Sequence, residues 1–140
     1  GAEVTLVCGP TPLGTTQAGI RRIDVESAED MFREATAHFP ESDAAILCAA
    51  VADFTPAQTS DRKIKRESED LVLHLKPTRD IAQALGQMKR KEQRLIGPGA
   101  GFRHDTNKIT IISRTDSVVY PLKSKKEVAA DIVDRLVSSF

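Results

Sequence analysis

The chain has 140 residues, of which 40% are hydrophobic and 29% are charged, a composition typical of one globular domain spanning residues 1–140 rather than of a disordered segment. Lysine and arginine total 20 residues and aspartate and glutamate also total 20, so no global field attracts nucleic acid and any anion site has to be local. Tryptophan is absent and only 4% of the residues are aromatic, which disfavours a base-stacking platform for single-stranded nucleic acid.

The first part of the chain predicts strands that alternate with helices. A β-rich run covers residues 1–8, and an alternating apolar pattern over residues 20–25 predicts a second strand. Ser27 is the expected N-cap of a helix that Pro40 ends, and acidic residues in its first turn favour that start. The apolar run over residues 44–54 has no alternation, which predicts a strand buried on both faces.

The second part continues the same alternation. Residues 71–75 alternate and predict a strand, and Thr78 is the expected N-cap of the helix that follows. Further strands are expected over residues 108–112 and 118–120, and a last helix over residues 127–136. The helix after Thr78 is expected to bury four apolar residues, namely Ile81, Ala82, Leu85 and Met88. Alternating strands and helices predict an α/β fold with a mostly parallel sheet and right-handed crossovers.

One place breaks this alternation. Residues 94–97 begin like a buried strand but reach Pro98 after four residues, with no helix before the next expected strand. Such a short connection is unusual in a parallel sheet, which needs long crossovers. We therefore expect that sequence is missing at the junction between Gly97 and Pro98.

The cysteines and histidines indicate no catalytic thiol or metal centre. Cys8 and Cys48 lie in apolar strand-like runs and are expected to be small buried hydrophobic residues. His38, His74 and His104 have no partner at metal-ligand spacing, so no metal-ligating side chains are predicted. Neither a signal-peptide pattern nor a long apolar segment is present in the sequence, so the chain is expected to be cytoplasmic and free of the membrane.

The strongest functional signal follows the apolar run at 44–54. That run ends in small side chains and the carboxylate of Asp53, and Lys63 and Lys65 lie on the loop beyond. Ligands of open α/β sheets bind at the carboxyl ends of strands, so this pattern predicts a site for a phosphorylated or nucleotide-like ligand. Two alternatives stay open: an Asx turn at Asp53, and a solvated loop that contains the two lysines and Arg66.

The segment Pro77-Thr78-Arg79-Asp80 opens a helix directly after a strand. Backbone N–H groups at such a helix start bind phosphate, although an ordinary capped start gives the same pattern. The sequence contains no GxSxG elbow, Walker loop or GxGxxG fingerprint. A Rossmann-type oxidoreductase that binds nicotinamide or flavin is therefore a disfavoured alternative.

Six segments, taken together and in this order, resemble the phosphopantothenoylcysteine synthetase family, the phosphopantothenate–cysteine ligases of coenzyme A biosynthesis. In bacteria this ligase is usually the C-terminal half of a bifunctional protein whose other half is a flavin-dependent decarboxylase. The resemblance covers nearly the whole chain. The segments are residues 1–10, 23–28, 49–54, 63–65, 76–81 and 101–107.

The resemblance implies a Rossmann-like three-layer fold, a homodimer and a defined reaction. The family joins 4′-phosphopantothenate to L-cysteine with CTP and Mg²⁺ through an acyl-cytidylate intermediate, and releases CMP and pyrophosphate. FMN would be present only if a decarboxylase half were fused to the chain. The choice between CTP and ATP stays open, and CTP is preferred because the motifs look bacterial.

The resemblance also implies site residues. Lys63 would contact the nucleotide and assist formation of the cytidylate, with Lys65 as a less certain second cation. Cations suit this chemistry because a carboxylate that attacks a triphosphate brings anions together. The nucleotide site would be lined by Ala49, Ala50, Asp53 and Phe54, with Pro77, Thr78, Arg79 and Asp80 beside the base or phosphates.

Two departures from the family pattern are expected. The family has a further strand and a Ser-Asn-x-Ser-Ser-Gly loop before the position of Gly1. After residue 97 the family continues with a strand–helix–strand unit and a lysine-rich flap, a length of ~30 residues or more. A chain that lacks both would be a catalytically incomplete assembly domain of a bifunctional decarboxylase/synthetase, which is the second alternative.

Overall fold

The fold is described by a computed structural model that covers residues 1–65, 70–97, 106–107, 109–112 and 117–139. The junction between Gly97 and Pro98, and the predicted loop that follows it, lie outside the described residues. No helix in the described part of the chain is long and apolar enough to span a membrane.

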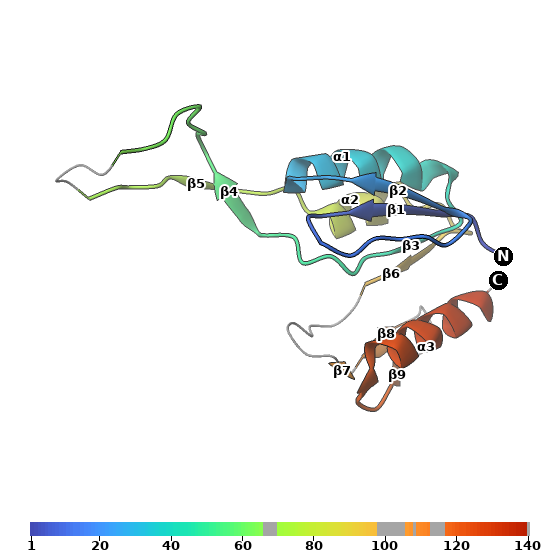
Figure 1. Ribbon diagram of the computed structural model, residues 1–140. Helices are drawn as coiled ribbons and strands as arrows, with labels where there is room; N and C mark the ends of the chain where they lie inside the picture. The colour runs from blue at the N-terminus through green and yellow to red at the C-terminus, as the bar shows by residue number, and fades with distance from the viewer. Residues whose placement is uncertain (66–69, 98–105, 108, 113–116, 140) are drawn as a thin grey trace. The chain divides into compact units, whose positions relative to one another are not determined.

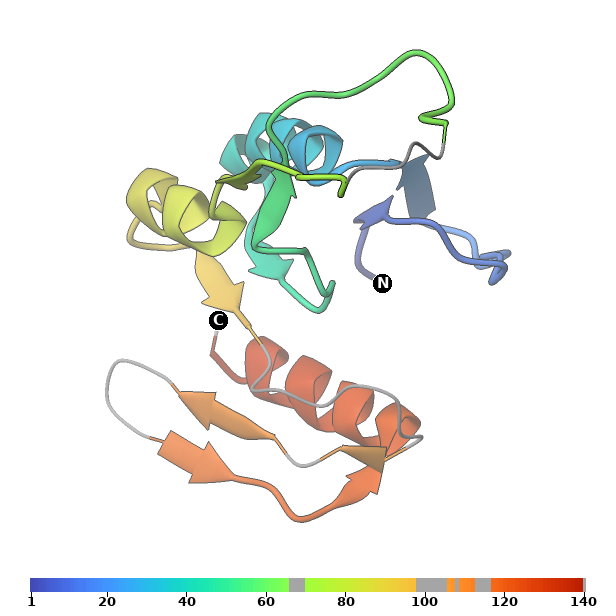
Figure 2. The ribbon, with the colours of Figure 1, turned by 90° about the vertical axis from the view of Figure 1, so that its left-hand side faces the viewer.

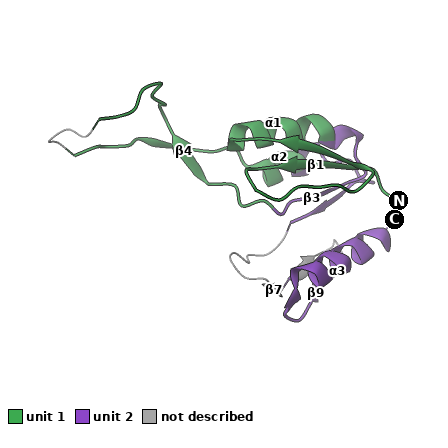
Figure 3. Cartoon of the chain, in the orientation of Figure 1, with its two compact units in different colours: residues 1–38, 49–85 green, residues 39–48, 86–140 purple. Residues whose placement is uncertain are grey.

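The chain divides into two compact units, coloured separately in Figure 3. The first unit contains residues 1–38 and 49–85, and the second contains residues 39–48 and 86–140. Both units are discontinuous in sequence. The chain leaves the first unit after His38, returns to it at Ala49, and passes to the second unit again at Gly86.

The first unit begins with a parallel pair of strands, β1 (Val4–Cys8) and β2 (Ile20–Asp24). Figure 1 shows the two strands side by side, beneath α1. Gly19 stands before β2 with a φ of +84°, and its carbonyl accepts the Val4 N–H at 2.8 Å. Glycine suits this position because L side chains rarely adopt a positive φ. The predicted strand over residues 20–25 is confirmed, with β2 one residue shorter.

Helix α1 (Ala28–His38) is the predicted helix between Ser27 and Pro40. The Ser27 hydroxyl accepts the Asp30 N–H at 3.1 Å, which confirms Ser27 as the capping residue. The Asp30 carboxylate in turn accepts the Ser27 N–H and hydroxyl at 3.2 and 2.6 Å. A 3₁₀ turn, η1 (Phe39–Glu41), follows directly.

An antiparallel pair formed by β4 (Phe54–Pro56) and β5 (Leu75–Pro77) completes the strands of the first unit. The predicted strand over residues 71–75 is therefore wrong for most of its length. Residues 71–73 are highly exposed, with values of 64%, 71% and 61%. The β4–β5 register would place these residues opposite the polar segment 58–60, which does not continue β4. Among the residues that the structure describes, no strand pairs with residues 71–73, so their alternating pattern forms no strand.

Helix α2 (Ile81–Met88) buries Ile81 and Leu85, which are 9% and 1% exposed, as predicted. The prediction is wrong for the other two apolar residues, because Ala82 is exposed and Met88 is 43% exposed. Residues four apart share one face of a helix, whereas Ala82 lies about 100° around the axis from Ile81. Met88 lies on the same face as Ile81 but is the last residue of α2, so the buried stripe is both narrower and shorter than the apolar pattern indicates.

The second unit contains the parallel pair β3 (Ala44–Ile46) and β6 (Arg94–Ile96). Pairing continues to the Leu47 N–H, which donates to the Ile96 carbonyl at 2.7 Å. The prediction of one buried strand through residues 44–54 is wrong: Ile46 is 41% exposed, and Cys48 is exposed rather than buried. Strand β6 ends at Ile96, so the ladder ends with the bond from Leu47. The small side chains that follow Leu47 also favour a strand only weakly.

The rest of the second unit joins two short antiparallel pairs to a helix. Strand β7 (Thr106–Asn107) pairs with β10 (Lys123–Ser124), and β8 (Thr110–Ile112) pairs with β9 (Ser117–Val119). Figure 2 shows α3 (Lys125–Val137) alongside β7 and β10. Strands β8 and β9 and helix α3 match the elements predicted over residues 108–112, 118–120 and 127–136, with shifted ends, whereas β7 and β10 were not predicted.

Helix α3 begins with a capping box. The Ser124 side chain accepts the Glu127 N–H at 3.3 Å, and the Glu127 carboxylate accepts the Ser124 N–H at 3.0 Å. Lys123 donates to both carboxylate oxygens of Asp131 at 3.0 and 2.8 Å, which ties β10 to the helix. The buried residues Ile109 and Val128 form a small core on which Tyr120 and Ile132 pack.

These elements give a mixed α/β fold, as predicted from the alternation of strands and helices. The ladders β1–β2 and β3–β6 are parallel; α1 follows β2, and α2 lies between β3 and β6 in the chain. Three short antiparallel ladders, which the sequence pattern did not predict, accompany them.

Candidate nucleotide site

Two of the predicted nucleotide-site segments meet in the first unit. Phe54 stands opposite Pro77 in the β4–β5 ladder. Just beyond it, the Thr78 N–H donates to the Asp53 carbonyl at 2.9 Å, and the Thr78 hydroxyl donates to the Ala52 carbonyl at 2.6 Å. The segment 49–54 and the segment 77–80 are therefore neighbours in space, as a shared site requires. We refer to these two contacts as the 52–78 junction.

The 52–78 junction corrects the predicted role of Thr78. Its hydroxyl and its N–H are both committed to the backbone of residues 52–53, so Thr78 does not cap α2. The cap is Asp80, whose carboxylate accepts the Gln83 N–H at 2.8 Å. Aspartate is as good an N-cap as serine or threonine, and it stands directly before the first helical residue. A pattern of possible capping residues in sequence could not separate the two.

Asp53 also differs from its prediction. It does not end a buried strand; it lies immediately before β4, and its side chain is exposed. Within the described residues no hydrogen bond to its carboxylate forms an Asx turn. The backbone carbonyl serves the junction while the carboxylate faces solvent, which leaves it accessible to a ligand.

The small residues before Asp53 line the same stretch of chain. Ala49 and Ala50 are both exposed, and Phe54 is 60% exposed. Exposed alanines permit close approach of a ligand to the backbone. An exposed phenylalanine offers an apolar surface on which a base or sugar can pack.

Lys63 and Lys65 lie on the segment that joins β4 to β5, and both side chains are exposed. In Figure 1 this segment runs out beyond the ends of both strands. Arg66 lies outside the described residues. The structure thus shows both lysines as accessible cations on the chain that leaves the 52–78 junction.

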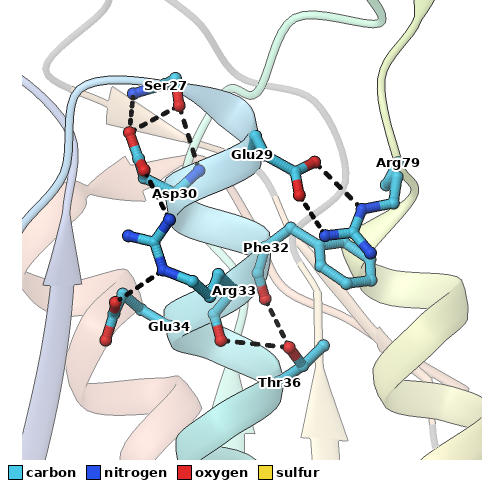
Figure 4. A network of polar contacts seen from close by, with 8 residues as sticks. All are labelled: Ser27, Glu29, Asp30, Phe32, Arg33, Glu34, Thr36 and Arg79. Atoms are coloured by element: carbon cyan, nitrogen blue, oxygen red, sulfur yellow. Dashed lines mark hydrogen bonds and ion pairs between the residues drawn. The ribbon is translucent and has the colours of Figure 1, made fainter.

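Arg79 has partners that the sequence did not predict. Its Nε donates to the Glu29 Oε2 at 3.0 Å, its Nη2 makes a short contact with the Glu29 Oε1, and its guanidinium carbon lies 3.5 Å from the centroid of the Phe32 ring. Figure 4 shows this two-point ion pair and the stacked ring at the N-terminal end of α1. Glu29 stands 50 residues earlier in the chain. In the sequence, Glu29 is recognisable only as an acidic residue in the first turn of a helix.

A second polar cluster occupies the next face of α1 (Figure 4). Hydrogen bonds from Ser27 and Arg33 hold the pKa of the Asp30 carboxyl below its usual range. Arg33 also contacts Glu34 at 3.2 Å. This cluster caps and braces the helix and is separate from the Arg79 contacts.

No group of three or more histidine, cysteine, aspartate or glutamate side chains in the described part of the chain is arranged to hold a metal ion.

The fold is that of an α/β domain, and the 52–78 junction brings together two of the segments predicted to line a nucleotide site. The chain belongs to the family described as the DNA/pantothenate metabolism flavoprotein C-terminal domain, whose profile matches residues 1–100. The family resemblance expected from the six sequence segments is thereby confirmed.

Several named proteins are similar to the chain. A cysteine/cysteine sulfinic acid decarboxylase from an unknown prokaryotic organism is 44% identical over 170 aligned positions, covering 99% of this chain and 47% of that protein. The coenzyme A biosynthesis bifunctional protein CoaBC of Bacillus subtilis (strain 168) is 32% identical, covering 99% of this chain and 42% of that protein. The chain thus spans less than half the length of these relatives.

Solved structures agree with the fold. The crystal structure of the C-terminal domain of CoaBC matches with a TM-score of 0.76 at 32% identity, covering 99% of this chain and 76% of that one. A DNA/pantothenate metabolism flavoprotein from Streptococcus pneumoniae matches with the same TM-score at 15% identity, which shows the fold alone. The Rossmann-like α/β fold expected from the resemblance is confirmed by the first match.

Proposed function

We propose that the chain is the nucleotide-binding part of a ligase in coenzyme A biosynthesis. The reaction joins 4′-phosphopantothenate to L-cysteine with CTP, through an acyl-cytidylate, and releases CMP and pyrophosphate. The observation that carries this proposal is the 52–78 junction, because it unites the two sequence segments that the family resemblance assigns to the nucleotide. Family membership and the CoaBC relatives support the assignment.

The residues of the site have distinct parts in this proposal. The nucleotide site is lined by Ala49, Ala50 and Phe54. The exposed carboxylate of Asp53 accepts a hydrogen bond from the sugar or base of the nucleotide. Lys63 neutralises charge on the phosphates as the substrate carboxylate attacks, with Lys65 as a second cation. A lysine suits this task because its ammonium is a mobile point charge that can follow the phosphates. Pro77, Thr78 and Asp80 form the neighbouring wall.

Mg²⁺ fits this site as a companion of the triphosphate. Mg²⁺ usually keeps several waters and binds through one or two carboxylates and the substrate phosphates. The exposed Asp53 carboxylate is suited to such a contact, whereas that of Asp80 is engaged with the Gln83 N–H. The ion would supply charge neutralisation on the triphosphate.

The expected missing segment is part of the proposal. The relative at 44% identity aligns over 170 positions with a chain of 140 residues, so at least 30 of its positions have no counterpart here. A segment of that size agrees with the strand–helix–strand unit and flap expected after residue 97. An intact mass well above 15.3 kDa would show that the natural protein contains more than this sequence.

The central experiment measures pyrophosphate release by the full-length parent protein with CTP, Mg²⁺, 4′-phosphopantothenate and L-cysteine. Release that requires 4′-phosphopantothenate is expected, and its absence would refute the ligase function. Lys63→Gln should lower kcat by about 10²- to 10³-fold, the usual effect of losing one stabilising group. Lys91→Gln, which removes an exposed lysine outside the site, is the matched control. Replacing CTP with ATP in the same assay tests the choice of nucleotide.

A second candidate function is favoured by the relative named as a cysteine/cysteine sulfinic acid decarboxylase. In that case the chain would be an assembly domain for a fused decarboxylase that binds FMN, without ligase activity of its own. The same full-length protein would then release CO₂ from cysteine or cysteine sulfinic acid and no pyrophosphate from CTP. Measuring both products on one preparation separates the two functions.

We further propose that the full-length protein is a homodimer in the cytoplasm. Its substrates belong to the metabolite pool of the cytoplasm, and its free thiols Cys8 and Cys48 suit a reducing compartment. Exposed apolar side chains on the chain between Phe54 and Leu75 support an association surface. Light scattering of the full-length protein would measure the mass of the assembly.

A further inference from the structure

We infer that Glu29 and Phe32 are positioning residues that hold Arg79 on α1 and thereby fix the turn at residues 78–80 beside the backbone of residues 52–53. The expected effect of these residues on CTP binding rests on the proposed function. Their expected effect on the conformation of the turn does not depend on that function.

The first step is the state of the Arg79 guanidinium. Two of its nitrogens face the two oxygens of Glu29, and its flat face covers the Phe32 ring at 3.5 Å from the centroid. A two-point carboxylate contact combined with ring stacking selects arginine over lysine, because only a planar fork makes both contacts. The side chain therefore holds one geometry although it is 53% exposed.

The second step concerns charge. Glu29 neutralises the Arg79 cation at close range, so Arg79 offers a triphosphate little net attraction while this pair exists. A direct phosphate contact would have to break the ion pair and leave a carboxylate beside the phosphates. The geometry thus assigns Arg79 to the support of the site rather than to contact with the nucleotide.

The third step is the place of Arg79 in the chain. Thr78 on one side is bonded to the backbone of residues 52 and 53, and Asp80 on the other side caps α2 through the Gln83 N–H. Arg79 lies between these two anchors and adds a third, to α1. A turn fixed at three points presents its backbone in one arrangement, which lowers the ordering cost of binding a ligand there.

The test compares Glu29→Ala, Arg79→Ala and the double variant of the full-length protein. Amide hydrogen exchange at Thr78 is measured first, without any ligand, because this N–H reports the 52–78 junction directly. Each single variant should exchange roughly tenfold faster at Thr78, and the double variant should be no faster than Arg79→Ala, since that variant already loses the Glu29 contact. Arg33→Ala is the matched control: Arg33 lies on α1, makes carboxylate contacts and is 59% exposed.

Steady-state kinetics with CTP follow on the same proteins. Both single variants should raise the KM for CTP by a similar factor, roughly fivefold to tenfold, with kcat within about twofold of the wild type. Arg79→Lys, which keeps the charge without the fork, should resemble Arg79→Ala in both readouts.

Three results would overturn the inference. Thr78 exchange that stays at the wild-type rate in Glu29→Ala would show that the pair does not fix the turn. A raised KM in Arg79→Ala with a normal KM in Glu29→Ala would show direct contact between Arg79 and the nucleotide, as would rescue by Arg79→Lys. A wild-type protein without CTP turnover refutes the proposed function instead, and the exchange data still decide the positioning role.

Discussion

The buried side chain of Gln93 gives the most demanding prediction for stability. It is 2% exposed, and its amide nitrogen donates to the carbonyls of Phe39 and Ser42 at 2.8 and 2.7 Å, while its oxygen accepts the Arg90 N–H at 2.8 Å. This one residue therefore links η1, the approach to β3 and the turn before β6 within the second unit. Gln93→Leu keeps much of the side-chain volume and removes all three hydrogen bonds.

The expected cost follows from these contacts. Each hydrogen bond contributes about 1 kcal/mol net, so the loss of three should lower the free energy of unfolding by about 3 kcal/mol. Gln87→Leu is the matched control, because the same change at an exposed helix position should alter stability by less than about 0.5 kcal/mol. Urea denaturation followed by circular dichroism measures both variants. A Gln93→Leu value within about 0.5 kcal/mol of the wild type would refute the role assigned to this residue.

The pH dependence of the stability of Gln93→Glu gives a second test of these hydrogen bonds. Its introduced carboxylate would face the carbonyls of Phe39 and Ser42, and burial together with these neighbours raises the pKa of that carboxyl in the folded protein above its unfolded value. The folded variant then binds a proton that the unfolded chain lacks, so its stability rises relative to the wild type as the pH falls through this window. Gln93→Leu should show no such recovery. Equal pH profiles for the two variants would contradict the hydrogen-bond geometry.

Other predictions concern the helices. Leu85→Ala should lower the free energy of unfolding by about 2–5 kcal/mol, because the Leu85 side chain is only 1% exposed. Met88→Ala, at a position that is 43% exposed, should lower it far less. Urea denaturation measures both variants. Ser124→Ala should cost about 1 kcal/mol through loss of the α3 cap, visible as a lower urea midpoint. Hydrogen bonds from Ser124 hold the pKa of Glu127 below its usual range, so the carboxyl stabilises the fold at neutral pH and loses this contribution as the pH falls through its folded pKa. An NMR titration should find the Glu127 pKa depressed, and Ser124→Ala should return it toward the ordinary value; an unchanged titration in that variant would contradict the capping box.

Local signals in the sequence predicted the elements whose determinants are themselves local. The structure has three such features: the strand that ends at Asp24, the Ser27 cap, and the end of α1 before Pro40. Each of them depends on neighbouring residues. The buried pair Ile81 and Leu85 also follows from helical spacing alone.

Predictions failed where the outcome depends on a distant partner. Residues 71–73 alternate like a strand but pair with no strand in the described part of the chain. The apolar run after Ala44 leaves its ladder where β6 ends. In the candidate site, the hydrogen bonds between Thr78 and residues 52–53 agree with the prediction that the segments 49–54 and 77–80 lie close together. The Glu29–Arg79 pair could not be found from one sequence, because nothing in either local pattern points to the other residue.

The exposed thiol of Cys48 has a practical use. It directly precedes Ala49, whereas Cys8 is only partly exposed. A maleimide fluorophore should therefore attach first at Cys48, within a few bonds of the stretch assigned to the nucleotide. The natural sequence thus provides an attachment point for an optical reporter of substrate arrival, without an engineered cysteine.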